Sequence, residues 1–95
     1  MKTALTWDEQ KRQTNLLKHG LDFAMASEVL ESKYRLDIPV VRAGEHRVQS
    51  ISYALGFLAV LTVVHTGRHG STRIISFRRA SKEEREVYDA WLENQ

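Results

Sequence analysis

Cysteine is absent from this chain of 95 residues, and proline occurs only once, at Pro39. A chain without cysteine has no disulfide framework, no thiolate metal site and no thiol nucleophile, so a reducing cytoplasm is the simplest expected compartment. The longest apolar run, Phe57 to Val64, has eight residues, whereas a helix that spans a membrane needs about 20. We therefore expect a cytoplasmic protein that does not contact a membrane and performs no redox chemistry.

Metal-binding patterns are missing as well. None of the segments with helical character carries two histidines four residues apart, and no cluster of acidic residues accompanies the histidines. We expect neither a metal ion nor another cofactor.

The overall composition is that of an ordinary folded protein. Hydrophobic residues make up 42% and charged residues 27% of the chain, and 95 residues suffice for one core but not for two. We predict a single domain over residues 1–95. The formal charge is only +2, but the segment from Arg68 to Arg85 holds six arginines and lysines against two glutamates. Such a segment fits either a nucleic-acid contact or a solvated surface.

The first third of the chain is predicted to form two short helices between residues 6 and 31. Thr6-Trp7-Asp8-Glu9 matches a capping box, and Lys18-His19-Gly20 supplies the cations and the glycine typical of a helix end. Asp22 can cap a second helix. Apolar residues then recur three and four positions apart, at Phe23, Ala26, Val29 and Leu30.

The middle of the chain changes to strand character. Pro39 limits the first candidate, Tyr34 to Val41, to an edge position. In the second, Arg47 to Tyr53, apolar Ile51 and Tyr53 alternate with Ser50 and Ser52. The apolar, β-branched run from 57 to 66 fits a central strand buried on both faces. A turn at 54–56, a hairpin loop at 67–71 and a last strand at 72–77 complete this region. The connections are too short for crossover helices, so we predict a four-stranded antiparallel sheet.

A C-terminal helix should follow, because Ser81-Lys82-Glu83-Glu84 repeats the capping-box pattern. Apolar residues then recur at helical spacing, at Val87, Tyr88, Trp91 and Leu92. The predicted order is α-α-β-β-β-β-α, an α+β domain with helices packed on an antiparallel sheet.

Three blocks of this sequence together resemble the BrnT family of toxins. The first holds Trp7-Asp8-Glu9, Lys11, Asn15, Lys18-His19-Gly20 and Phe23. The second holds Gly44-Glu45-x-Arg47, Gly56 and Val63-Val64-His65-Thr66. The third holds Arg68, Arg73 through Ser81, Glu84 and Tyr88. The resemblance covers nearly the whole chain, and only the segment from Ser32 to Ala43 departs from it, being less acidic than the family pattern.

The resemblance implies a RelE-like fold and an endoribonuclease that arrests growth. It further implies neutralisation by a BrnA-like antitoxin of the ribbon-helix-helix class, in a complex of two toxins with two antitoxins. That complex represses its own operon, so operator DNA is expected to be contacted only through the antitoxin.

Metal-independent RNA cleavage uses the 2′-hydroxyl as nucleophile and needs a base, an acid and cations that stabilise the charged phosphate. Arginine suits the last role because its planar guanidinium binds phosphate through two hydrogen bonds. The candidate catalytic residues are His65, Arg68, Arg73 and Glu45. The candidate RNA-binding residues are Lys18, His19, Arg47, Arg78 and Arg79. Lys11 and Lys18 are solvated helix lysines by default, and the resemblance to the family makes both possible RNA contacts. In a regular strand Arg73 and Arg79 would share one face with Ile75 and Phe77, with Arg78 opposite.

Each candidate also has a structural interpretation. His65 can be a strand-end histidine hydrogen-bonded to the fold, and His19 can interact with the dipole of its helix. Glu45 and Arg47 would lie on the same side of a strand and can form a surface ion pair of little energetic value. Any single arginine can contact an antitoxin instead of RNA. Packing is the expected role of Trp7 and Trp91, whereas His46 and His69 are expected in exposed loops.

Two other functions remain open. The chain can be a non-catalytic binding protein that holds an antitoxin and adjusts operator binding, or a ParE-like toxin with a protein target. The fold does not separate these functions, because one scaffold hosts several activities. A titratable group close to the arginines favours cleavage, and His65 lies three residues from Arg68 in the sequence.

Overall fold

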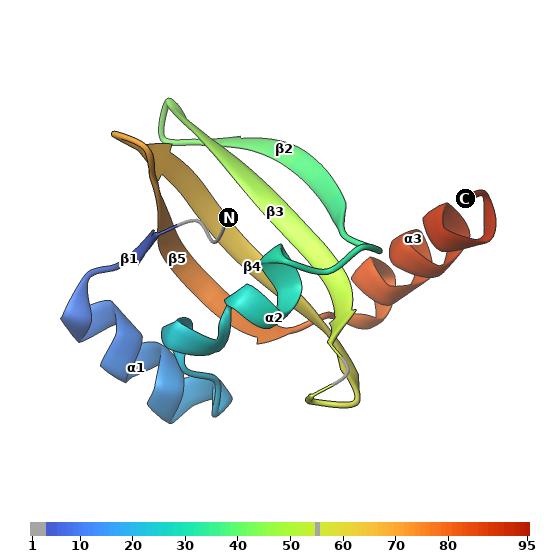
Figure 1. Cartoon of the computed structure of the whole chain (residues 1–95), viewed down its shortest axis with the longest axis horizontal. Helices are drawn as coiled ribbons and strands as arrows, with labels where there is room; N and C mark the ends of the chain where they lie inside the picture. The colour runs from blue at the N-terminus through green and yellow to red at the C-terminus, as the bar shows by residue number, and fades with distance from the viewer. Residues whose placement is uncertain (1–3, 55) are drawn as a thin grey trace.

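The computed structural model describes residues 4–54 and 56–95. In these residues a five-stranded sheet of order β1-β5-β4-β3-β2 is accompanied by three α-helices and one 3-10 helix (Figure 1). The elements in chain order are β1 Leu5–Thr6, α1 Glu9–His19, η1 Phe23–Met25, α2 Ser27–Leu30, β2 Leu36–Arg42, β3 Glu45–Ala54, β4 Ala59–Arg68, β5 Ser71–Arg79 and α3 Lys82–Glu93. The α+β class is confirmed. No helix in the described ranges is long and apolar enough to cross a bilayer.

The prediction of a purely antiparallel, four-stranded sheet is wrong at its first strand. Leu5 and Thr6 pair in parallel with Thr72 and Arg73 of β5, and the amide of Thr72 donates to the carbonyl of Ala4 at 2.9 Å. A strand of two residues is too short to produce an alternating pattern, so periodicity could not reveal it.

The predicted start of the first helix is also wrong. Thr6 lies in β1, and the cap of α1 is Asp8, whose carboxylate accepts hydrogen bonds from the amides of Gln10 and Lys11. The predicted end is confirmed, because Gly20 adopts a φ of 71° and its amide donates to the carbonyl of Leu16. Glycine adopts this left-handed conformation without the steric cost that other residues bear.

The second predicted helix is divided into two short pieces. Asp22 caps the 3-10 helix η1, as its carboxylate accepts from the amide of Ala24, and α2 then begins at Ser27. The apolar residues of this segment are still buried as predicted, since Phe23, Ala26 and Val29 are fully enclosed. Their three-residue spacing is compatible with either kind of helix.

Tight two-residue turns connect two of the strand pairs. Ala43 and Gly44 join β2 to β3, and His69 and Gly70 join β4 to β5, all four with positive φ. This conformation defines a type I′ turn, whose twist matches that of antiparallel strands. The strands β3 and β5 are therefore longer than the sequence predicted, and the loop expected at 67–71 is reduced to its two central residues.

The central strand is β4, as predicted, although it begins at Ala59 instead of Phe57. Gly56 to Leu58 form a turn in which Leu58 has a φ of 53°, and Leu55 of the predicted turn lies outside the described residues. Leu61 and Val63 point to a core that they form with η1, α2 and β5. Residues paired across neighbouring strands share a face, so the register defines two sides of the sheet, the core face and the opposite α3 face.

The helix α3 begins against the α3 face and then projects past the sheet, as Figure 1 shows. Its predicted capping box is confirmed, because the Ser81 hydroxyl accepts from the amide of Glu84 and the Glu84 carboxylate accepts from the amide of Ser81. Tyr88 is buried and connects the helix to the sheet. Its hydroxyl donates to the carbonyl of Tyr34 at 2.8 Å and accepts from the amide of Tyr53 at 3.3 Å.

Candidate active site

A bulge in β5 decides which arginines lie together. Val64 pairs with Ser76 and the next residue, His65, pairs with Ile74, so Ile75 is an extra residue in β5. Arg73 pairs with Thr66 and Arg78 pairs with Thr62, which places both arginines on the α3 face. The prediction that Arg78 lies opposite Arg73 is therefore wrong, because it assumed regular alternation through the bulge.

The α3 face has an open hollow of about 730 Å³. Three arginines line this α3-face hollow, each from a different strand: Arg42 from β2, Arg47 from β3 and Arg78 from β5. Gln49 and Glu84 lie among them. The arrangement can bind an anion from several directions, because guanidinium groups match the geometry of phosphate oxygens.

Arg78 is held by Glu84 of α3 through a two-pronged ion pair. The two terminal nitrogens of Arg78 lie 2.8 and 2.9 Å from the two carboxylate oxygens of Glu84. The hydrogen bonds from Arg78 lower the pKa of Glu84 to about 2, helped by the Ser81 amide and by Gln49 and opposed by burial. Since a general base works best with a pKa near the working pH, Glu84 is a poor base in this state and serves to position Arg78.

Glu45 and Arg47 form the ion pair that their spacing allowed. The Nε of Arg47 lies 2.7 Å from a carboxylate oxygen of Glu45, and both side chains are partly exposed. They lie on the α3 face at the end of β3, beside the Arg42 end of β2. The carboxylate of Glu45 thus lies next to the α3-face hollow, close to the arginines that line it.

His65 lies on the other side of the sheet. It pairs with Val48 and Ile74, which places its side chain on the core face, where a hollow of about 440 Å³ also contains Arg35, Glu31 and Thr72. The predicted grouping of His65 with Arg73 is therefore wrong. Neighbouring residues of a strand point to opposite faces, and Arg73 is paired with Thr66, the residue after His65.

A chain of hydrogen bonds fixes the imidazole of His65. The Ser50 hydroxyl donates to Asp37 at 2.6 Å, so the same oxygen must accept from the Nε2–H of His65 at 2.8 Å. Arg35 in turn forms an ion pair with Asp37 at 3.0 Å. Burial lowers the pKa of His65 below its ordinary value of 6.5, against the opposing effect of Asp37 and with a smaller contribution from Arg35. The neutral form is favoured.

The predicted RNA-binding residues of the first helix lie in a third place. Lys18 and His19 line a hollow of about 440 Å³ between α1 and β5, together with Lys11, Thr14, Ile75 and Ser76. Two further candidates are apart from all three hollows described so far. Arg79 is exposed and pairs with Leu61, so it points away from Arg78. The backbone of Arg68 ends β4, but its side chain lies outside the described part of the structure.

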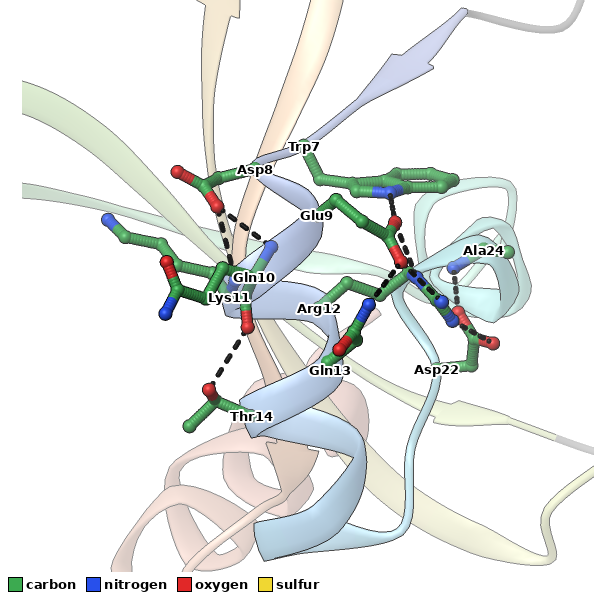
Figure 2. A network of polar contacts seen from close by, with 10 residues as sticks. All are labelled: Trp7, Asp8, Glu9, Gln10, Lys11, Arg12, Gln13, Thr14, Asp22 and Ala24. Carbon is green, nitrogen blue, oxygen red and sulfur yellow. Dashed lines mark hydrogen bonds and ion pairs between the residues drawn. The ribbon is translucent and has the colours of Figure 1, made fainter.

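Polar contacts on the other side of α1 hold this helix in place. Arg12 forms ion pairs with Glu9 at 2.6 Å and with Asp22 at 2.9 Å, and the indole of Trp7 also donates to Glu9 (Figure 2). The hydrogen bond from Arg12 lowers the pKa of Glu9 to about 2. The network ties the start of α1 to the cap of η1, and Trp7 also packs against the core, as predicted.

Asn15 is a structural residue that sequence reasoning did not assign a role. Its amide nitrogen donates to the carbonyls of Leu21 and Phe77 at 3.0 and 2.7 Å, and its oxygen accepts from the amide of Phe77. The side chain continues the pairing of β5 where β1 has ended, and so fixes α1 along this edge. The available signal was its place in the first block that resembles the BrnT family.

Residues 7–84 match the model of a protein family described as ribonuclease toxin, BrnT, of type II toxin–antitoxin systems. The chain belongs to the BrnT family. This confirms the resemblance noted in the sequence, and it makes the chain a member of a family of toxins that act with an antitoxin. No curated protein matches the chain.

The match to BrnT includes every lining residue of the hollows on the α3 face and beside α1, and all those of the core-face hollow except Leu5. Sequence reasoning found Arg47, Arg73 and Arg78 but missed Arg42 and Gln49, because neither belongs to a recognisable motif. Among residues 4–54 and 56–95 of this BrnT chain, no three histidine or acidic side chains gather in a way that could hold a metal ion. The hollow on the α3 face is lined by three guanidinium groups.

Proposed function

We propose that this chain is a metal-independent endoribonuclease toxin whose active site is the α3-face hollow. The observation that carries the proposal is the convergence of Arg42, Arg47 and Arg78, from three different strands, on one open hollow. RNA offers a phosphate every nucleotide, and in-line cleavage by the 2′-hydroxyl concentrates negative charge on the phosphate oxygens in the transition state. Fixed guanidinium groups stabilise that charge better than they stabilise the substrate.

The arginines and one carboxylate have distinct roles in this proposal. Arg47 and Arg78 bind the scissile phosphate, and Arg73, on the same face, binds a neighbouring one. Glu45 accepts the proton of the 2′-hydroxyl, whose oxygen attacks phosphorus and expels the 5′-oxygen. The products are a 2′,3′-cyclic phosphate and a 5′-hydroxyl, and the departing oxygen takes its proton from water or from an arginine-bound water.

The His65 hydrogen-bond chain has a structural role in this proposal. The imidazole is hydrogen-bonded to Ser50 on the core face, so it does not reach a phosphate bound among the arginines. The role of Arg68 as a further phosphate ligand stays a prediction from the sequence.

The partner in this proposal is a BrnA-like ribbon-helix-helix antitoxin, two copies with two toxins, which also carries the contact with operator DNA. The compartment is the cytoplasm. This part of the proposal is supported by the BrnT family match, whose description names a type II toxin–antitoxin system.

The decisive experiment is cleavage of a labelled single-stranded RNA by the purified chain in excess EDTA. We expect products with cyclic phosphate ends, and a loss of about 100-fold or more in rate for Arg47→Ala and Arg78→Ala, comparable to the removal of an oxyanion donor. Arg85→Ala is the matched control, because Arg85 is exposed on α3 and does not line the α3-face hollow.

The variants also distinguish an active site on the α3 face from one on the core face. His65→Gln should cleave RNA at close to the wild-type rate once its folding has been verified by circular dichroism. If His65→Gln lost as much of the cleavage rate as Arg78→Ala, the active site would have to be assigned to the core face. Absence of cleavage by the wild type, with and without ribosomes, would favour a binding protein or a toxin with a protein target.

A further inference from the structure

The hollow between α1 and β5, here called the α1 hollow, adjoins the α3-face hollow. Both are lined by Ile75 and Ser76, the two residues at the β5 bulge. A regular strand would direct two successive side chains to opposite faces, but the extra residue at the bulge breaks this alternation. The bulge therefore forms a wall that the two hollows share.

The α1 hollow presents two cations, Lys11 and Lys18, that have no ion-pair partner among the described residues. Lys11 and Lys18 are seven residues apart, which is about two helical turns, so both project from the same side of α1. Figure 2 shows Lys11 on the side of the helix away from the Arg12 network. In the described part of the chain neither lysine forms an ion pair, whereas Arg47 and Arg78 are both paired with glutamates.

The remaining groups of the α1 hollow are mostly neutral. Thr14 and Ser76 contribute hydroxyl groups, the amide of Asn15 is engaged with the backbone of Leu21 and Phe77, and His19 stands beside Lys18. Asp8 is the acidic lining residue, and its carboxylate already accepts from two backbone amides at the start of α1. A polyanion is thus the class of ligand that matches this surface.

We propose that the two hollows form one track for single-stranded RNA, with Lys11 and Lys18 binding backbone phosphates outside the cleavage site. The inference rests on the proposed function, and it adds a second phosphate-binding subsite and the class of substrate. Single-stranded RNA is favoured because the track turns from the α3 face of the sheet over β5 to α1. A duplex is too stiff to follow such a turn, since the persistence length of double-stranded DNA is about 150 base pairs.

The test is a binding series with single-stranded RNAs that carry 2′-O-methyl groups and so resist cleavage. Their lengths run from a dinucleotide to about 16 nucleotides, the upper site size of compact single-strand-binding domains. The double variant Lys11→Ala/Lys18→Ala is compared with Lys33→Ala/Lys82→Ala, which removes the same charge from exposed lysines that line none of the hollows.

We expect the loss of affinity in Lys11→Ala/Lys18→Ala to grow with RNA length and to reach about tenfold or more for the longest RNA. For that RNA the slope of log affinity against log salt should become shallower by about 1.4, because each phosphate contact with a single strand contributes about 0.7. The control pair should change the affinity less than twofold. A blunt-ended duplex of equal length should bind more weakly than the single strand.

The track would be overturned by an equal loss at every RNA length, by an equal loss in the control pair, by a duplex that binds as well as the single strand, or by normal binding of long RNA without Lys11 and Lys18. The proposed function is judged separately by cleavage in EDTA and its dependence on Arg78. A chain that cleaves RNA, yet binds long RNA normally without Lys11 and Lys18, would retain the active site and refute the track.

Discussion

At the scale of single residues, the hydrogen-bond chain from His65 through Ser50 to Asp37 makes the protonation state of one imidazole important for folding. The geometry requires a proton on Nε2, and the serine hydroxyl has only one proton to give. Adding a second proton places a positive charge in a partly buried position beside Arg35. Protonation should therefore weaken the folded state.

We expect the wild type to lose stability as the pH falls below about 6.5, the pKa that His65 has when unfolded. The folded pKa of His65 is lower, so below pH 6.5 the unfolded state binds more protons and gains stability. Above that pH this contribution is fully retained. Urea unfolding at several pH values between 5 and 8 should show a smaller decline for His65→Gln. His46→Gln is the control, because His46 is exposed, and parallel curves for His65→Gln and the wild type would contradict the expectation.

Residue spacing predicted local pairs but not the grouping of distant ones. The Glu45–Arg47 ion pair follows from two residues two apart on a strand, and the structure contains it. The grouping of Arg73 with Arg78 depends on the extra residue Ile75, and nothing in the periodicity of the sequence marks a bulge. The separation of His65 from these arginines follows from the same register.

At the scale of elements, α3 is attached to the sheet at two points. Near its start, Glu84 binds Arg78 and Gln49, and one turn further on the buried Tyr88 bonds two backbone groups. Beyond Tyr88 the helix projects past the sheet (Figure 1), and already at Val87, just before Tyr88, the exposed fraction is 53%. The attachment of this helix therefore depends on few contacts.

Tyr88→Phe should lower the free energy of unfolding by about 1 to 3 kcal/mol, because it leaves the carbonyl of Tyr34 and the amide of Tyr53 without their partner. Chemical denaturation measures this change. Tyr34→Phe is the matched control, since the ring of Tyr34 is largely exposed and its backbone carbonyl is unchanged. The free energy of unfolding of Tyr34→Phe should stay within about 0.5 kcal/mol of the wild-type value. Equal stability of Tyr88→Phe and the wild type would show that the hydroxyl contributes nothing.

Elements with a strong local signal were predictable from the sequence, and the weaker ones were not. The capping box at Ser81, the helix end at Gly20 and the edge position of Pro39 each rest on one residue with a definite backbone preference. β1 has only two residues, and its pairing partner lies more than 60 residues away in the sequence. The division of the second helix depends on how Phe23 and Val29 pack in the core, which is a tertiary effect.

At the scale of the whole molecule, the sheet separates two polar clusters. The arginines of the α3-face hollow lie on one side, and the His65 cluster lies on the other, with buried Thr62 and Val63 of β4 between them. Substitutions in the two clusters share no contacts, so their effects on stability should add. RNA binding and pH-dependent stability can thus be measured independently in the same protein.

The amide of Asn15 has a consequence for self-association. Open edges of a sheet recruit other chains, and here the two outer strands are protected in different ways. Pro39 has no N–H to offer at the β2 edge, whereas on β5 the short β1 covers Thr72 and Arg73 and the Asn15 amide satisfies Phe77. Asn15→Ala should therefore aggregate at concentrations where Leu17→Ala, changed at a largely exposed position of the same helix, stays monomeric in light scattering. Equal behaviour of the two variants would mean that α1 shields this edge by its bulk, and that the amide is dispensable for solubility.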